Sequence, residues 1–201
     1  MSGQAPGAPS AIPPVCKLLV IGSSGAGKST LARRIAELTG LPLIHLDALY
    51  WSPGWQVPER AQWRAQVAEL VERPAWVMDG NYGDTLPMRL AACDAVVFLD
   101  LQRWRCLWRI VRRRVQFHGR GRPDMGPGCP ERLSWALVRF VLGYRRTRRP
   151  GILRQLALAR SQGKAVFVLS RPGQVERFVQ ALPVPAGNAL EVSPPPWTPG
   201  G

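Results

Sequence analysis

The sequence predicts an α/β domain built on a mostly parallel sheet. Short apolar runs alternate with longer amphipathic stretches between residues 15 and 182, which is the pattern of strands joined by crossover helices. The first apolar run ends in a glycine-rich turn, and a helical pattern follows it directly. The chain has 201 residues and is 46% hydrophobic, which is enough for one well-buried core.

The two ends of the chain differ in composition from this domain. Residues 1–14 and 183–201 together hold 10 of the 20 prolines, and Gly, Ala and Ser fill much of the rest. Such segments lack the apolar side chains that a packed core needs, so we expect two disordered tails. Residues 15–182 are therefore expected to form a single domain.

The strands and helices follow from the apolar pattern. Residues 16–22 predict the first strand, and a helix runs from about Lys28 to a stop at residues 40–42. A second strand is expected to end at Asp47, and the aromatic, turn-rich stretch 48–57 predicts irregular structure. The other expected elements are helices over 58–72, 103–117, 132–146, a stretch ending at Ser161 and 173–181, and strands ending at Asp79, Leu101 and Ser170.

The helix over residues 103–117 has an unusual composition. Its apolar residues fall on one stripe, which we expect to face the core, and its arginines fall largely off that stripe. The stripe consists of Trp104, Trp108, Val111 and Val115, and the arginines are Arg105, Arg109, Arg112 and Arg113. The Gly- and Pro-rich stretch that follows, about residues 117–131, predicts a mobile loop.

Positive charge is concentrated in one part of the chain. The formal net charge is +14, and residues 103–149 contribute +12 of it through 14 Arg against two acids. The planar guanidinium fork matches phosphate geometry, so nucleotides, nucleic acid and anionic lipid are all candidate partners of this segment. A solvated helix face is the alternative interpretation.

Several classes of protein are excluded or disfavoured. No run approaches the roughly 18 consecutive apolar residues that span a bilayer, so we expect no membrane partner. The first residues lack the basic start and apolar stretch of a secretory signal, which favours a cytoplasmic protein. The cysteines contain no CxxC pair, which argues against a disulfide framework and against a zinc site; they are Cys16, Cys93, Cys106 and Cys129.

The strongest motif is GxxxxGK[ST], placed between the first expected strand and the first expected helix. Its glycines let successive backbone N–H groups face a phosphate, while Lys28 reaches the outer phosphates and Ser29 can ligate Mg²⁺. The motif therefore predicts binding of a nucleoside triphosphate, ATP. The expected binding residues are Gly22, Ser23, Ser24, Gly25, Ala26, Gly27, Lys28, Ser29 and Thr30.

Three carboxylates are expected where strands end, which is the edge at which ligands of parallel sheets gather. Asp79, after a buried strand, best matches a carboxylate that orders magnesium together with Ser29. Asp47 precedes an aromatic stretch and could orient an acceptor hydroxyl or accept its proton, and a cap or turn is its alternative role. Asp100 could simply cap the helix that begins near Arg103.

Other side chains complete the expected site. Arg109 and Arg113 are expected to neutralise charge on a transferred phosphoryl group, with Arg120 or Arg122 in a lid over about residues 117–131. Trp51, Trp55 and Trp63 could form the wall of an acceptor pocket or belong to the core. His45 is expected to point away from Asp47 and to be packed rather than catalytic.

These segments together resemble the P-loop small-molecule and nucleotide kinases of the adenylate kinase-like group. The resemblance is closest to the bacterial adenylate kinase-related proteins labelled DNA topology modulation proteins. It covers most of residues 16–180. The segments that carry it are GSSGAGKSTLA, HLDALYWSPGW, DGNYGDTLPMRL, DAVVFLDLQRWRCLWRIVRRR, GRGRPDMGPGCPERL and AVFVLS.

The resemblance implies further roles and shows departures. It implies a three-layer P-loop kinase fold with sheet order 2-3-1-4-5 and an Arg-rich helical lid, in which Arg109 and Arg113 contact ATP phosphates and residues 170–172 border adenine. The segment with which adenylate kinases grip their acceptor nucleotide is replaced by HLDALYW, and DGNY lacks the proline and arginine that follow DG in those enzymes, although Arg89 lies downstream. AMP is therefore not assumed as the acceptor.

The resulting interpretation is a phosphotransferase that moves the γ-phosphoryl group of Mg-ATP to a small acceptor, with a nucleoside monophosphate as one candidate. Lys28, Asp47, Arg109 and Arg113 are its expected catalytic residues. An ATP-binding, DNA-associated regulatory protein with little or no kinase activity is the alternative, because the basic segment at residues 103–149 would attract nucleic acid. A P-loop hydrolase is a third interpretation.

Overall fold

The computed structural model describes residues 15–116, 128 and 134–183. Five parallel strands form one sheet in the order β2-β3-β1-β4-β5, which is the order that the family resemblance implies. The strands are β1 Lys17–Gly22, β2 Leu43–His45, β3 Trp76–Asp79, β4 Ala95–Leu99 and β5 Ala165–Leu169. β1 lies in the middle of the sheet, so the loop that follows it emerges at the centre of the strands' carboxyl edge.

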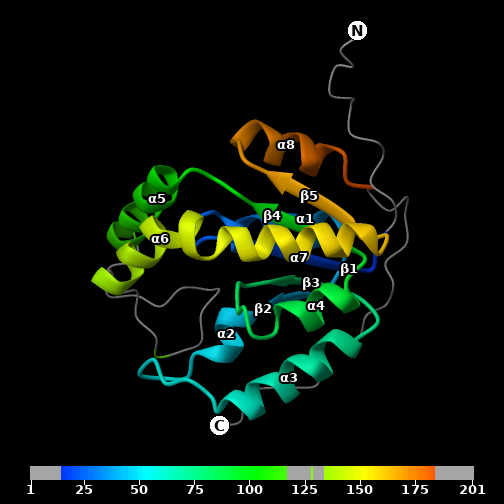
Figure 1. The fold of residues 1–201 in the computed structure, drawn as a ribbon, viewed down its shortest axis with the longest axis horizontal. Helices are drawn as coiled ribbons and strands as arrows, with labels where there is room; N and C mark the ends of the chain where they lie inside the picture. Colours follow the sequence, from blue (N-terminus) through cyan, green and yellow to red (C-terminus); the bar gives the residue numbers. More distant parts are fainter. Residues whose placement is uncertain (1–14, 117–127, 129–133, 184–201) are drawn as a thin grey trace, which may run out of the picture.

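Helices cover both faces of the sheet and make a three-layer fold (Figure 1). Successive side chains of a strand point to opposite faces, and β1 shows this directly: Leu18 and Val20 belong to one buried cluster, and Leu19 and Ile21 to the other. The first cluster includes residues of α1 Lys28–Thr39, α5 Arg103–Gln116, α6 Trp135–Thr147 and α8 Pro172–Gln180. The second includes residues of α2 Leu46–Tyr50, α3 Arg60–Glu72, α4 Leu86–Ala92 and α7 Arg149–Ser161.

Two short helices differ from the sequence-based expectation. β2 ends at His45, so Asp47 lies in the first turn of α2, where a carboxylate is favoured by the helix dipole, and not at the end of the strand. The burial of Leu46 in the second cluster holds this helix against the core. α4 was not expected at all, because its seven residues are too few for a clear period, although Pro87 in its first turn is a typical start signal.

The orientation of α5 also corrects the prediction. Its inward side chains are Cys106 and Ile110, which are completely buried, whereas the expected apolar stripe faces outward. The prediction assumed that tryptophan and valine would seek the core. The close approach of Cys106 to the loop after β1 fixes the opposite rotation of the helix, because a side chain on Gly25 would meet the Cys106 carbonyl oxygen at 2.3 Å.

The described residues test only some of the expectations about membrane spans, cysteines, tails and lid. Among the described residues, no helix is long and apolar enough to cross a membrane. Cys16, Cys93 and Cys106 are free, and burial raises the pKa of Cys93 to about 11. The two expected tails and nearly all of the expected lid, including Arg120, Arg122 and Cys129, lie outside the described residues.

Candidate active site

The loop between β1 and α1 is shaped by glycines with positive φ angles. Gly22, Gly25 and Gly27 have φ of 152°, 76° and 93°. A side chain at Gly25 would also meet the carbonyl oxygen of Cys106 at 2.3 Å, and a side chain at Gly27 would meet Nη1 of Arg109 at 2.9 Å. The loop therefore curls as the motif predicts, and it packs directly against α5.

The polar groups of this loop suit an anionic ligand. Nζ of Lys28 lies over the loop, 3.3 Å from the carbonyl oxygen of Ser23. The buried hydroxyl of Ser23 has no hydrogen-bond partner among the described residues. The backbone N–H of Gly22 donates to Oδ1 of Asn81 at 3.1 Å, which ties the loop to the residues that follow β3. Glycine-shaped backbone, a lysine and a helix start together fit the phosphates of ATP.

The loop lines one side of a large cleft of about 1330 Å³ at the carboxyl edge of the sheet. Ser24 to Thr30 of the loop and the start of α1 form this side, with Arg109 and Arg113 of α5. The other lining residues come from α2, from the segments after α2 and β3, and from α6 and α7. They include Asp47, Tyr50, Trp51, Trp55, Asn81 and Tyr82.

Each of the three expected carboxylates has a protein partner. Asp47 lines the cleft and accepts a hydrogen bond from the hydroxyl of Tyr82 at 2.7 Å. Asp79 is 4% exposed, and its Oδ1 lies 2.6 Å from Nδ1 of His45. Asp100 is paired with Nε of Arg149 at 2.8 Å. Asp47 is thus the one of the three that lines the cleft.

The arginines of α5 take different positions. Arg109 donates from Nη1 to the carbonyl oxygen of Ala26 at 2.9 Å, which holds its guanidinium over the phosphate-binding loop. Arg113 also lines the cleft, one turn further along α5, and Arg148 at the end of α6 lines it as well. Arg149, at the start of α7, is the partner of Asp100.

Aromatic side chains form one wall of the cleft. Trp51 and Trp55 line it with their rings 5.2 Å apart, whereas Trp63 is buried behind them against Tyr50 and Tyr82. Trp55 has φ of 66°, which is the only positive φ of a non-glycine among the described residues. Residues in this conformation are strained and cluster at ligand sites.

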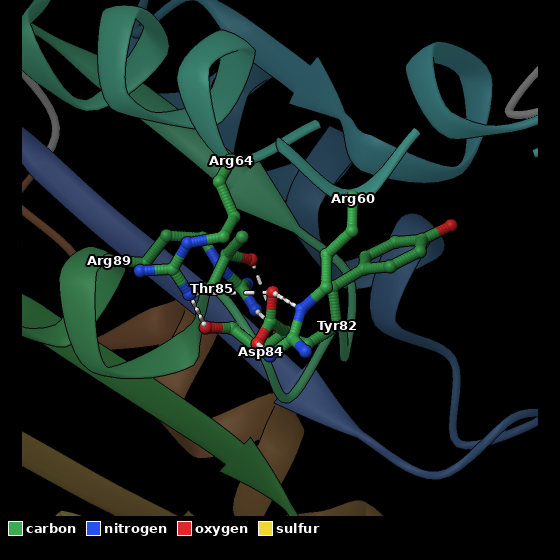
Figure 2. A network of polar contacts seen from close by, with 6 residues as sticks. All are labelled: Arg60, Arg64, Tyr82, Asp84, Thr85 and Arg89. Carbon is green, nitrogen blue, oxygen red and sulfur yellow. Dashed lines mark hydrogen bonds and ion pairs between the residues drawn. The ribbon is translucent and has the colours of Figure 1, made fainter. Parts of the chain in front are cut away.

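A buried arginine supports the segment that carries Tyr82 (Figure 2). Arg89 of α4 is completely buried and donates to the carbonyl oxygens of Gly80 and Tyr82 at 2.9 and 2.8 Å. Burial lowers the pKa of Arg89 to about 10. On the outer side, Arg60 and Arg64 of α3 contact Asp84, and they hold the pKa of that carboxyl below its usual value.

Arg89→Met should destabilise the protein, because it leaves the carbonyls of Gly80 and Tyr82 without their donor. We expect a loss of about 2 kcal/mol in the free energy of unfolding, measured by denaturant titration. Arg60→Met removes an exposed arginine from the same network and should cost clearly less. Equal losses in the two variants would contradict the supporting role of Arg89.

Sequence patterns missed several residues of this site. Tyr82 contacts Asp47 of α2, Asn81 contacts Gly22 of the loop after β1, and Arg89 of α4 contacts the carbonyl oxygen of Gly80. None of these contacts follows from a periodic pattern in the sequence. For Asn81 and Tyr82 the one signal was their place just after the strand that ends at Asp79, and for Arg89 it was the comparison with the arginine that follows DG in adenylate kinases. Tyr82 is largely buried beside Asp47, and both burial and that carboxylate raise the pKa of its hydroxyl.

Comparisons with known proteins concern the fold. No protein-family model matches the sequence, and a search of curated proteins found no match either. Among solved structures, an unliganded sugar kinase from Janibacter sp. HTCC2649 is 18% identical over 86% of this chain and 96% of its own, with a TM-score of 0.49. A gluconokinase from Sinorhizobium meliloti 1021 is 21% identical over 83% of this chain and 90% of its own, with a TM-score of 0.46.

A third similar structure is a shikimate kinase from Acinetobacter baumannii in complex with shikimate. It is 20% identical over 83% of this chain and 89% of its own, with a TM-score of 0.49. The function proposed below is inferred from the residues of the site itself.

Proposed function

We propose that this protein is an ATP-dependent phosphotransferase that moves the γ-phosphoryl group of Mg-ATP to a small acceptor. One observation carries the proposal: the glycine-rich loop with Lys28 and Arg109 lines the same cleft as Asp47, Trp51 and Trp55. Phosphoryl transfer requires a phosphate-binding group and an oriented acceptor in one site, and this cleft has residues suited to each.

The donor half is formed by the loop after β1. Its backbone N–H groups and the ammonium of Lys28 are the proposed contacts of the ATP phosphates. Arg109 and Arg113 are proposed to face the transferred group, where charge spreads over the phosphoryl oxygens. Because Arg109 is already held by Ala26, its guanidinium needs little reorganisation.

Ser29 and Asp79 are the proposed magnesium ligands. When bound, magnesium neutralises charge on the phosphate oxygens. Ser29 lies at the start of α1 and lines the cleft. Asp79 lies at the end of the neighbouring strand β3, 4% exposed and with Oδ1 2.6 Å from Nδ1 of His45, and does not itself line the cleft. A carboxylate in this position would act on a bound cation through the cation's water shell.

The acceptor half is centred on Asp47. Tyr82 donates to one oxygen of this carboxylate and leaves the other to accept a proton from an acceptor hydroxyl. Trp51 and Trp55 provide flat apolar surface for a ring-shaped acceptor. A nucleoside monophosphate, which is one candidate from the sequence, and small hydroxylated metabolites are the two acceptor classes proposed for this wall.

The proposal is tested by measuring ADP release from Mg-ATP across nucleoside monophosphates and small hydroxylated metabolites. ADP release that depends on one acceptor class would support a kinase and name its substrate. Phosphate release without any acceptor would favour the hydrolase. ATP binding without turnover, together with a sequence-selective DNA shift that survives physiological salt, would favour the regulatory protein.

Tyr82→Phe should slow transfer while leaving ATP binding intact. The variant removes the hydrogen bond that orients Asp47, and a bond to a charged group of this kind corresponds to about a tenfold loss in kcat. The KM for ATP should not change, because Tyr82 lies on the acceptor side. Thr85→Val is the matched control, because it removes a hydroxyl that donates to the carbonyl oxygen of Tyr82 at 3.2 Å and does not line the cleft, and it should retain activity. An equal loss in both variants would count against the positioning role of Tyr82.

A further inference from the structure

The outer face of α5 exposes a continuous apolar stripe. Trp104, Trp108, Val111 and Val115 are 62%, 61%, 49% and 74% exposed. Their spacing of four, three and four residues places them on one side of the helix. Single exposed apolar side chains are ordinary on a protein surface, but four in register on one helix mark an interaction site.

Arginines border this stripe on both sides. Arg105 and Arg112 flank it on one side and Arg103 and Arg114 on the other, and α5 contains no acidic residue. The guanidinium of Arg103 lies 5.0 Å from the ring centroid of Trp104, and that of Arg112 lies 5.4 Å from the ring centroid of Trp108. The face therefore combines apolar surface with a wholly cationic rim.

The inner side of α5 prevents the helix from rolling to bury this stripe. Cys106 and Ile110 are fully buried, and the backbone of Cys106 touches Gly25 so closely that no side chain fits between them. Arg109 is bound to the carbonyl of Ala26. A rotation that turned Trp104 and Trp108 inward would break both contacts with the phosphate-binding loop.

The charges and the shape of this face distinguish its candidate occupants. A second copy packed along the same stripe would place the arginine rims against each other, with no acid on α5 to pair them. Nucleic acid could pair with the arginines and stack on tryptophan, but it offers nothing to Val111 and Val115, and a guanidinium already lies over one face of each ring. An anionic bilayer surface suits both features, because its interface takes up tryptophan and aliphatic side chains while its headgroups pair with arginine.

We infer that the outer face of α5 is a docking surface for anionic membranes, with Trp104, Trp108, Val111 and Val115 entering the interface and Arg103 and Arg105, which do not line the cleft, contacting the headgroups. This differs from the sequence-based expectation of no membrane partner, which rested on the lack of a spanning segment; a peripheral helix lying on the surface needs none. The inference does not depend on the proposed kinase activity.

The test is co-sedimentation of the full chain with vesicles. We expect binding to vesicles of phosphatidylcholine mixed with phosphatidylglycerol, weaker binding as salt rises, and little binding to phosphatidylcholine alone. Trp104→Gln/Trp108→Gln should weaken binding to the anionic vesicles by about tenfold or more. Arg103→Gln/Arg105→Gln should weaken it by about tenfold and reduce its dependence on salt.

Matched variants separate this face from general surface effects. Val57→Gln/Leu158→Gln removes two other exposed apolar side chains, and Arg154→Gln/Arg177→Gln removes the same positive charge elsewhere. Both should bind like the original chain. Because the tryptophans are exposed, thermal unfolding should be nearly unchanged in Trp104→Gln/Trp108→Gln, which excludes loss of binding through misfolding.

Four results would overturn the inference. They are absence of binding to anionic vesicles, binding that the tryptophan variant leaves unchanged, and equal losses in the matched variants. The fourth is evidence that this face binds a different partner. Such evidence would be a dimer in light scattering that Trp104→Gln/Trp108→Gln dissociates, or binding to single-stranded DNA at physiological salt that needs both tryptophans and exceeds binding to the vesicles.

Discussion

Lys28→Ala is expected to lower phosphoryl transfer by about 100-fold or more while the protein stays folded. The lysine begins α1, where alanine is equally acceptable to the helix, and its only hydrogen bond seen in the described structure goes to the carbonyl of Ser23. Among the described residues, its ammonium is the one lysine charge that lines the cleft. The measurement is acceptor-dependent ADP release, accompanied by circular dichroism and thermal unfolding.

A matched variant makes this prediction specific. Lys164→Ala also removes one ammonium, which donates to the carbonyl of Ala91 and does not line the cleft. It should keep full activity. A Lys28→Ala protein that turns over normally, or a Lys164→Ala protein that loses as much, would mean that the loop after β1 is not the donor site.

Gly25→Ala is expected to destabilise the protein by about 3 kcal/mol and to weaken ATP binding. A side chain at this position faces two costs: the positive φ of 76°, and a contact of 2.3 Å with the carbonyl oxygen of Cys106. The first costs about 1–2 kcal/mol for an L-residue, and relief of the second requires a shift of α5 away from the loop, which costs about 1–3 kcal/mol. Denaturant titration and ATP titration measure the two effects.

Gly40→Ala separates these costs. Gly40 follows α1 with a φ of 71°, but a side chain there would have no atom within 4 Å. It should therefore lose only the conformational part, about 1 kcal/mol, and bind ATP normally. If the two alanine variants lose equal stability, then the contact between the loop and α5 is not the constraint that the structure indicates.

Much of the fold follows from local patterns in the sequence. The strands are continuous apolar runs because helices cover both faces of the sheet, and this makes them easy to recognise. The glycine-rich motif could be placed because it lies between such a run and a helix with a regular apolar face. The strands and the phosphate-binding loop could therefore be predicted from local sequence, and the order of the strands from the family resemblance.

The parts that could not be predicted depend on contacts distant in sequence. The spacing of the apolar residues of α5 correctly predicted a helix, but the prediction that these residues face the core was wrong. The contact with the loop at Gly25 decides which side of the helix faces inward. Both Asp47 and Asp79 were predicted at strand ends, which is correct only for Asp79, and their partners Tyr82 and His45 lie 35 and 34 residues away. Short helices such as α4 are held by their neighbours and carry almost no periodic signal of their own.

The most direct test of the central claim follows the γ-phosphoryl group itself. With Mg-ATP labelled at the γ-phosphorus and the acceptor found in the ADP-release panel, the label should appear on that acceptor in step with ADP. Lys28→Ala should slow both by about 100-fold or more, and Tyr82→Phe should slow both together by about tenfold. Label that appears only as inorganic phosphate, or that stays on ATP despite binding, would contradict the assignment of the cleft as a site of phosphoryl transfer to an acceptor.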